Sequence, residues 1–175
     1  GSEMCIRDRE STVDRVNSDL LDIRQIFDAA NYNIVQEFDI SSEKFAEQFS
    51  LLYEVNSDKI ESLALYGNEG RLIASEPVAV EKENIDVKGQ DWYKNAESAI
   101  ENVHFSIPHI QNLYEDGLYR YHWVVSLSRY VDINDGEIPG SGVLLVDMKY
   151  SVIEDVLKQI NDSSEGIYYL SLIHI

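Results

Sequence analysis

Residues 118–131 read LYRYHWVVSLSRYV and alternate in character over almost the whole stretch. One face carries the larger side chains, which are Tyr119, Tyr121, Trp123, Val125 and Leu127. The other face carries Arg120, His122, Ser126 and Ser128, and only Val124 interrupts it. A period of two is typical of an antiparallel strand with one face on a core. We therefore expect a long, half-buried strand here, in which packing against the core is favoured for Tyr119 and Tyr121 and contact with a ligand is the alternative.

The segments on both sides of this strand predict further strands and helices. Downstream, we expect a loop at 132–142, a buried strand at 142–148, an amphipathic helix at 150–160 and the start of another strand at 166–170. Upstream, we expect strands at 60–66 and 71–75 around the turn GNEG, a helix at 91–100 and a short extended piece at 104–106. This order of elements indicates an α+β fold with an antiparallel sheet flanked by helices.

The N-terminal part predicts one long helix, from Ser11 to about Phe38. Its apolar residues are spaced three and four apart, at Val13, Val16, Leu20, Ile23, Phe27, Ala30 and Ile34, with Ile26 and Val35 widening the stripe. Either one side of this helix packs on its own domain, or its narrow seam pairs with a second copy in a parallel homodimer, and both can hold for different halves. Ser41 and Ser42 are then N-cap candidates for a second helix, whose apolar face is Phe45, Phe49 and Leu52.

The two ends of the chain differ in character from the rest. GSEMCIRDRE at 1–10 resembles a tag or a foreign tail, and SLIHI at 171–175 resembles a foreign C-terminal tail. Between them we expect a long N-terminal helix at 11–40, which is a candidate for dimerisation, and one α+β module at 41–162. We expect the start of a connection to a further module at 163–175.

Composition and motifs exclude several classes of function. The chain has 175 residues and a formal charge of −18, with a pI near 4.4, so it repels nucleic-acid phosphates. Cys5 is the only cysteine, and no apolar run approaches the ~20 residues that span a bilayer. Asp132–Glu137 lacks the glycine and glutamate spacing of a calcium loop. We therefore expect no catalytic residue, no metal site and no cofactor.

Four short motifs occur in an order that resembles a known family. They are Asp91-Trp92-Tyr93, Ser106-Ile107-Pro108, Ser128-Arg129-Tyr130-Val131 and Gly142-Val143-Leu144-Leu145-Val146-Asp147. Together with the helices and the strand pair that precede them, they resemble Cache domains, the PAS-like extracytoplasmic sensor modules of bacterial transmembrane receptors. The resemblance covers roughly residues 11–170. It implies the membrane-distal module of a double Cache domain, in a receptor whose transmembrane helices are absent from this chain.

The resemblance also implies a ligand pocket between the sheet and the helix that begins at Asp91. Trp92 and Tyr93 would line it from one side and Asp147 from the other, and aromatic rings with a carboxylate suit a small polar guest. Further candidates are Gln90, His109, Tyr121 and Trp123, and the loops 76–90 and 109–118 would flank the mouth as a lid. The alternative is that Trp92 and Tyr93 are core aromatics, with Asp147 satisfied by backbone donors.

Two departures from the family bear on the ligand. The amino-acid-binding members carry Arg where this chain has Gln90, and they carry Tyr where this chain has His109. Glutamine supplies no charge for a ligand carboxylate. We therefore expect a small molecule that is not a standard α-amino acid, and a neutral, polyhydroxylated or cationic compound is favoured.

The function that follows is that of an extracytoplasmic sensing domain in a sensor histidine kinase, signalling through a ligand-induced conformational shift. Two alternatives stay open at this point. One is the ectodomain of a chemoreceptor, and the other is a structural dimerisation module without a small ligand.

Overall fold

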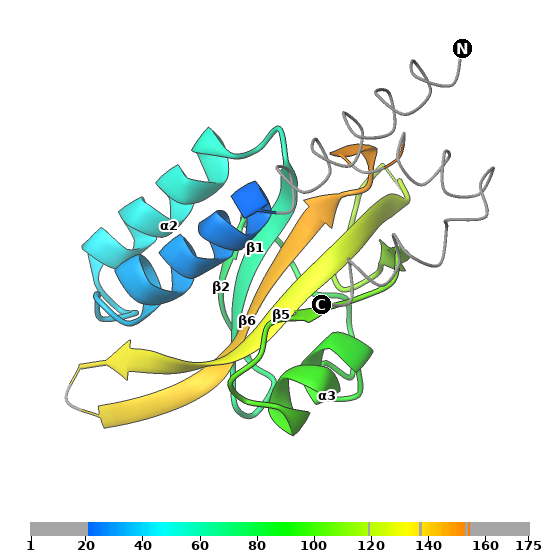
Figure 1. Cartoon of the computed structure of the whole chain (residues 1–175). Coiled ribbons are helices and arrows are strands. Elements are labelled where there is room, and N and C mark those ends of the chain that lie inside the picture. The colour runs from blue at the N-terminus through cyan, green and yellow to red at the C-terminus, as the bar shows by residue number, and fades with distance from the viewer. Residues whose placement is uncertain (1–20, 119, 137, 153, 155–175) are drawn as a thin grey trace, which may run out of the picture.

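A single antiparallel sheet organises the computed structural model, which describes residues 21–118, 120–136, 138–152 and 154. Its strands are β1 (Ile60–Gly67), β2 (Leu72–Glu76), β3 (His104–Phe105), β4 (His109–Gln111), β5 (His122–Asp135) and β6 (Ile138–Lys149). The order across the sheet is β2-β1-β6-β5-β3, and β4 pairs with the beginning of β5 (Figure 1). The predicted α+β fold with an antiparallel sheet flanked by helices is confirmed.

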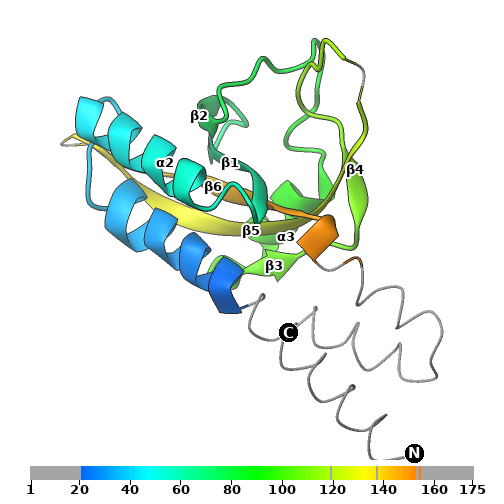
Figure 2. The same cartoon turned by 90° about the horizontal axis from the view of Figure 1, so that it is seen from above.

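One face of the sheet is covered by the N-terminal helical segment and α2 (Glu43–Val55) (Figures 1 and 2). Residues 21–28 are α-helical and continue into a π-helical stretch, η1 (Ala29–Val35). Ile23, Phe27, Ala30 and Ile34 are buried in one core cluster with residues of α2, β1, β5 and β6. In this segment the helix stripe therefore packs on its own domain, while Val13, Val16 and Leu20 lie outside the described residues.

The second helix follows its sequence signals closely. Ser42 is the N-cap, and its hydroxyl accepts a 3.1 Å hydrogen bond from the Phe45 backbone N–H. Phe45 and Phe49 are buried and stack at 5.3 Å between ring centroids. The predicted capped amphipathic helix is confirmed.

The opposite face of the sheet carries α3 (Asp91–Ser98) and two long connections, 77–90 and 112–121. A second core cluster lies there, formed by Ala64, Tyr66, Val87, Trp92, Tyr93, Ala96, Leu113, Val143 and Leu145. Because β1 and β6 have a core cluster on each face, their residues read as nearly continuous buried runs.

The β5–β6 connection differs from the loop predicted at 132–142. β5 continues to Asp135 and β6 begins at Ile138, so the two strands form one long hairpin. The turn contains Gly136 in the left-handed region, at φ +68°, which glycine adopts without strain. Gly, Pro and acidic residues in this stretch suggested a loop, but the outward-facing arms of a hairpin also tolerate them.

The start of β5 also differs from expectation. The strand begins at His122 rather than at Leu118, and Tyr121 is 80% exposed. The prediction that Tyr121 packs in the core is therefore wrong, because the alternating pattern begins before the strand does. β4 was not predicted at all, since three residues carry too little periodicity to be recognised.

The C-terminal expectations are tested only at their beginning. Residues 151, 152 and 154 are helical, which agrees with the predicted start of a helix near residue 150. The remainder of that helix, the predicted strand at 166–170, Tyr119 and both terminal tails lie outside the described residues.

Candidate functional site

A buried aspartate forms the centre of a polar row across three strands. Asp147 of β6 lies directly opposite Ser62 of β1 and Ser126 of β5 in the sheet register. Both serines turn their hydroxyls onto the carboxylate, Ser126 at 2.5 Å and Ser62 at 3.1 Å. We refer to Ser62, Asp147 and Ser126 as the polar row. All three are buried, on the sheet face that also carries α3.

The environment of Asp147 is unfavourable for a charge. Its side chain is fully buried, and burial raises the pKa of the carboxyl group. Hydrogen bonds from Ser126, Gln111 and Ser62, together with the field of His109, oppose this rise without cancelling it. In the part of the chain that the structure describes, no Lys or Arg forms an ion pair with Asp147.

Two residues of β4 complete the surroundings of the polar row. The side-chain amide of Gln111 donates to Asp147 Oδ2, so it is a third neutral donor on the same carboxylate. His109 Nε2 lies 3.3 Å from Ser126 Oγ, and its Nδ1 lies 3.0 Å from the Ile107 carbonyl. Residues of the short β4 therefore contact the polar row, His109 at Ser126 and Gln111 at Asp147.

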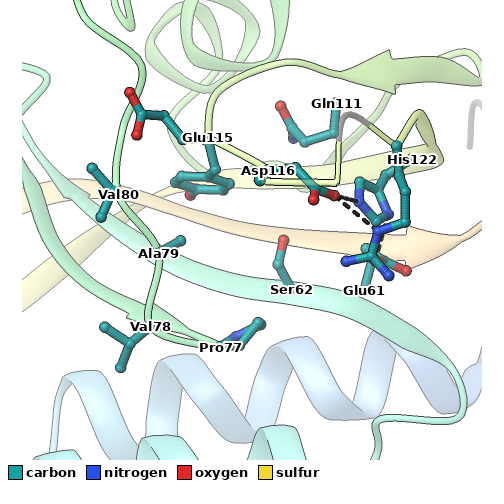
Figure 3. A pocket seen from close by; sticks show the side chains of 13 residues that line it. Glu61, Ser62, Pro77, Val78, Ala79, Val80, Gln111, Glu115, Asp116 and His122 are labelled. Carbon is teal, nitrogen blue, oxygen red and sulfur yellow. Dashed lines mark hydrogen bonds and ion pairs between the residues drawn. The ribbon is translucent and has the colours of Figure 1, made fainter.

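A cavity of about 490 Å³ opens next to this row (Figure 3). One wall is β1 with Glu61 and Ser62 together with the segment 77–80. The facing wall comes from β4, the following loop and the start of β5, namely Gln111, Tyr114, Glu115, Asp116, Gly117, Arg120 and His122. Ser62 and Gln111 are the members of its lining that touch Asp147. Parts of both predicted lid loops thus flank the cavity.

A second hollow of about 570 Å³ adjoins the first cavity. It shares Gln111, Tyr114 and most of the 115–122 wall with the first cavity and adds Lys82 and Tyr121. Residues between Gln111 and His122 therefore line both spaces.

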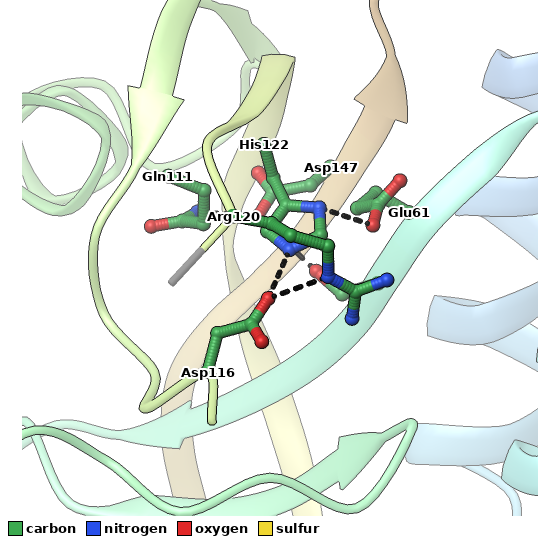
Figure 4. Close-up of polar contacts among 7 residues, drawn as sticks. Glu61, Gln111, Asp116, Arg120, His122 and Asp147 are labelled. Carbon is green, nitrogen blue, oxygen red and sulfur yellow. Dashed lines mark hydrogen bonds and ion pairs between the residues drawn. The ribbon is translucent and has the colours of Figure 1, made fainter. Parts of the chain in front are cut away.

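The rim of the first cavity is a charged network (Figure 4). His122 places Nδ1 at 2.9 Å from Glu61 and Nε2 at 2.8 Å from Asp116. Each ring nitrogen of His122 therefore faces a carboxylate, one on β1 and one on the loop after β4. Arg120 Nε adds a 3.1 Å contact to Asp116. The hydrogen bond from His122, with smaller help from Leu118 and Arg120, lowers the pKa of Asp116 to about 2.

The predicted aromatic wall lies in the core. Trp92 and Tyr93 are both buried and belong to the cluster beneath α3, and neither lines the two cavities above. Tyr93 donates a 2.8 Å hydrogen bond to the Gly67 carbonyl, and Trp92 packs on Tyr66 at 5.2 Å. Trp92 Nε1 has no hydrogen-bond partner among the described residues. A contact of either ring with a ligand stays a prediction.

The other predicted site residues do not gather at one place. Gln90 is the N-cap residue of α3, and its side chain contacts the Asp86 carbonyl at 3.4 Å, away from both cavities. Tyr121 lines the second hollow. Trp123 is half exposed and packs on Tyr150 at 6.1 Å. Only Asp147 and His109 of the predicted set meet at the polar row.

Sequence reasoning missed most of the cavity. Ser126 was placed on the correct face of its strand, but the row it joins depends on a sheet register that the sequence does not reveal. Ser62, Gln111, Glu61 and Asp116 belong to no motif. The nearest available signal was the density of polar residues between Gln111 and His122.

Neither a metal cluster nor a membrane-spanning helix occurs in the described ranges. No group of three or more His, Cys, Asp or Glu side chains there is arranged to hold a metal ion. No helix there combines the length and the apolar character needed to cross a bilayer.

Comparisons with known proteins find similarity at the level of structure. No family model and no curated protein matches the sequence. The chain is similar to the ligand-binding domain of the Pseudomonas aeruginosa amino-acid chemoreceptor PctC in complex with GABA, with a TM-score of 0.66 and 18% identity over 85% of this chain and 63% of that one.

Two further domains have the same architecture. The ligand-binding domain of the Pseudomonas fluorescens chemoreceptor CtaA, with L-alanine, has a TM-score of 0.62 at 18% identity and covers 89% of this chain and 60% of its own. The sensory domain of the Campylobacter jejuni chemoreceptor Tlp3, with isoleucine, has a TM-score of 0.56 at 13% identity and covers 89% and 64%. The chain therefore spans about three-fifths of the length of these domains.

These findings contradict the expectation that the ligand is not a standard α-amino acid. Matched domains hold GABA, L-serine, L-alanine, L-glutamine and isoleucine. The expectation depended on Gln90, and Gln90 does not line the cavity, so its lack of charge says nothing about what the cavity accepts. The cavity wall has a cation of its own in Arg120. The chain has the fold of the Cache-type ligand-binding domains of bacterial chemoreceptors.

Proposed function

We propose that this chain is the extracytoplasmic small-molecule-sensing module of a bacterial transmembrane receptor, and that it senses an amino acid. The observation that carries this proposal is the cavity of about 490 Å³ beside the polar row. Its size suits a single small metabolite, since ligand pockets typically measure about 300–1,000 Å³. The amino-acid complexes of the matched domains support the same class of ligand.

The charges around the cavity suit a zwitterion. Arg120 Nε binds Asp116, and its two terminal nitrogens form no hydrogen bond with any other described residue. A guanidinium edge with two free donors binds a carboxylate in a planar fork. The polar row on β1 and β6 offers acceptors for an amino group. The carboxylate of the ligand is therefore assigned to Arg120, and its amino group to the neighbourhood of Ser62 and Asp147.

Signalling would proceed by a population shift rather than by bond chemistry. The segments 77–80 and 111–122 contact the ligand from opposite sides, so a ligand that bridges them favours the arrangement in which they approach each other. The strands behind the cavity also pack against the N-terminal helical segment through the other face of the sheet. Movement at the cavity can therefore reach the N-terminal helical segment.

The matched domains favour a chemoreceptor over a sensor histidine kinase, because PctC, CtaA and Tlp3 are all chemoreceptors. The structural dimerisation module is the weaker alternative, since a module without a ligand needs no cavity next to a buried carboxylate. A homodimer through residues preceding Leu21 remains part of the proposal. In the described part, Ile23 and Phe27 are already buried within their own chain.

The proposal is tested by calorimetric titration with GABA, L-alanine, L-serine, L-glutamine and L-isoleucine. At least one is expected to bind, and Arg120→Gln should weaken that binding about tenfold because a charged hydrogen-bonding partner of the carboxylate is lost. The matched amine without a carboxylate, butylamine for GABA or ethylamine for L-alanine, should be unaffected by the change.

Arg71→Gln provides the control, since Arg71 is exposed in the β1–β2 turn, outside the cavity. If none of the five amino acids binds the parent chain, the proposed ligand class is wrong. If Arg120→Gln and Arg71→Gln weaken binding equally, the assignment of the carboxylate to Arg120 is wrong.

A further inference from the structure

Gln111 is connected in two directions. Its amide nitrogen donates to Asp147 Oδ2, and its amide oxygen accepts from the backbone N–H groups of Asn112 at 3.0 Å and Leu113 at 3.3 Å. The side chain is thus a bridge from the buried carboxylate to the loop that follows β4. It also lines both cavities, so it is the boundary between Asp147 and the open space.

The carboxylate beneath this bridge lacks a positively charged direct partner. Its three side-chain donors, Ser62, Ser126 and Gln111, are all neutral. Burial without a directly bonded cation leaves a carboxylate poorly compensated, and an ammonium group forms a stronger hydrogen bond with it than an amide does. When a ligand amine reaches Asp147, the carboxylate therefore exchanges a weak hydrogen-bond donor, the Gln111 amide, for a strong one, the ammonium group.

The space needed for that exchange is already occupied. Asp147 is fully buried, and Ser62 and Gln111 are the cavity residues that touch it. Ser62 is fixed within β1, at the sheet position opposite Asp147. Gln111 lies at the end of the three-residue β4, so it is the partner that can be displaced.

We propose that the Gln111 amide is a built-in substitute for the amino group of the ligand, which competes for Asp147 and so sets the affinity and the amine selectivity of the site. This inference rests on the proposed function for its ligand class. Because of this competition, the apparent Kd equals the intrinsic Kd divided by the fraction of molecules in which Gln111 is away from Asp147. It also disfavours ligands that lack a cationic amine, since these offer Asp147 no donor to replace the Gln111 amide.

The same exchange links ligand binding to the loop. When Gln111 leaves Asp147, the Asn112 and Leu113 N–H groups lose their fixed acceptor. That loop is in turn joined to the opposite wall, because Lys82 N–H donates to the Leu113 carbonyl at 2.9 Å and Glu115 N–H to the Val80 carbonyl at 2.8 Å. The displacement of one side chain therefore reaches both walls of the cavity.

The first test uses methylammonium chloride as a probe and needs no natural ligand. Gln111→Ala opens the position beside Asp147, so the probe should raise the melting temperature of this variant by about 3 °C over sodium chloride of equal concentration. The parent chain should respond less, and the double variant Gln111→Ala with Asp147→Asn should not respond. No difference between the single and double variants would overturn the inference.

The second test uses the amino acids of the titration above. For any that binds, Gln111→Ala should lower Kd about tenfold, as expected if the amide blocks the site in nine molecules of ten. The matched compound without an amine, butyrate for GABA or propionate for L-alanine, should show no gain. Weaker binding of the amino acid by Gln111→Ala would make Gln111 a direct ligand contact and would contradict the inference.

Two further variants protect these tests against a loss of folding. Gln111→Lys carries its own ammonium to Asp147 and should abolish the response to methylammonium while keeping the native circular dichroism spectrum. Gln48→Ala on α2 replaces a matched glutamine on the far side of the sheet and should behave as the parent does. If the parent binds no amino acid but Gln111→Ala responds to methylammonium, the ligand class fails and the role of Gln111 stands.

Discussion

The two faces of the sheet are built from alternate residues of the same strands, yet they differ in chemistry. One face is covered by α2 and the N-terminal helical segment, and we call it the helix-covered face. There β1 and β6 present Leu63, Leu65, Leu144 and Val146, which pack in a continuous apolar cluster. On the other face, the positions between them include Ser62 and Asp147, and a cavity opens beside them. One face therefore carries the larger apolar cluster, while the other combines a smaller apolar cluster with polar side chains beside a cavity where a ligand can bind.

The largest effect should come from breaking the helix-covered face. Phe49 is 1% exposed and stacks on Phe45 within that cluster. Phe49→Ala should lower the free energy of unfolding by about 3–5 kcal/mol, because it removes buried apolar area and leaves a cavity. Urea unfolding followed by circular dichroism measures this change.

The matched control lies on the same helix. Leu51 is 50% exposed, and Leu51→Ala should change the free energy of unfolding by less than about 0.5 kcal/mol. An equal loss in the free energy of unfolding for both variants would contradict the view that burial on the helix-covered face stabilises the fold.

The second prediction concerns Asp147 on the other face of the sheet, where the substitution should increase the free energy of unfolding rather than lower it. Asp147→Asn removes a buried charge and keeps a side chain of the same shape, so it should raise the free energy of unfolding at pH 7 by an amount on the order of 1 kcal/mol. The same variant should lose the binding of amines. Stability and function at this position would then oppose each other.

The pH dependence gives this prediction its check. The pKa of Asp147 in the folded chain is raised above the unfolded value near 3.8, so the contribution of Asp147 to stability is most favourable at low pH, where its carboxyl group is protonated, and is lost as pH rises through the folded pKa. The advantage of Asn should therefore be largest at neutral pH and shrink toward pH 4. An advantage that grows as pH falls would contradict the burial argument.

The same contrast explains what the sequence could predict. Periodicity identifies the strands and helices of the helix-covered face, and the Ser42 cap and the Phe45–Phe49 stripe are correctly predicted because local and tertiary preferences agree there. The polar row depends on register. Ser62 and Asp147 are 85 residues apart, and only the pairing of β1 with β6 brings them together.

The misplaced features are those in which local signals are weak or shared by two structures. Gly136 and Pro139 favoured a loop, although a two-residue turn and the outer arm of a hairpin accept the same residues. The π-helical stretch Ala29–Val35 was not foreseen, because its sequence reads as ordinary helix. Trp92 and Tyr93 were placed correctly at the start of α3, but the family pattern did not reveal that they face the core.

The smallest expected effect concerns the charged rim of the cavity, where the measured quantity is the pKa of Asp116. The pKa of Asp116 is about 2 in the folded chain, with the His122 hydrogen bond as the first cause and the Arg120 contact a lesser one. Because the folded pKa lies below the unfolded value near 3.8, the contact contributes stability above pH 3.8 and loses it as pH falls toward 2. A carboxyl-carbon NMR titration should give a midpoint near 2.

Two substitutions then separate the causes of this shift. His122→Gln should move the midpoint most of the way back toward 3.8, whereas Arg120→Gln should move it only slightly. Equal shifts would mean that the general field of the rim, rather than the His122 hydrogen bond, holds Asp116 ionised. Because this contact links the 112–121 connection to β1 through Glu61, its loss should also loosen the wall that faces the polar row, while the helix-covered face stays unchanged.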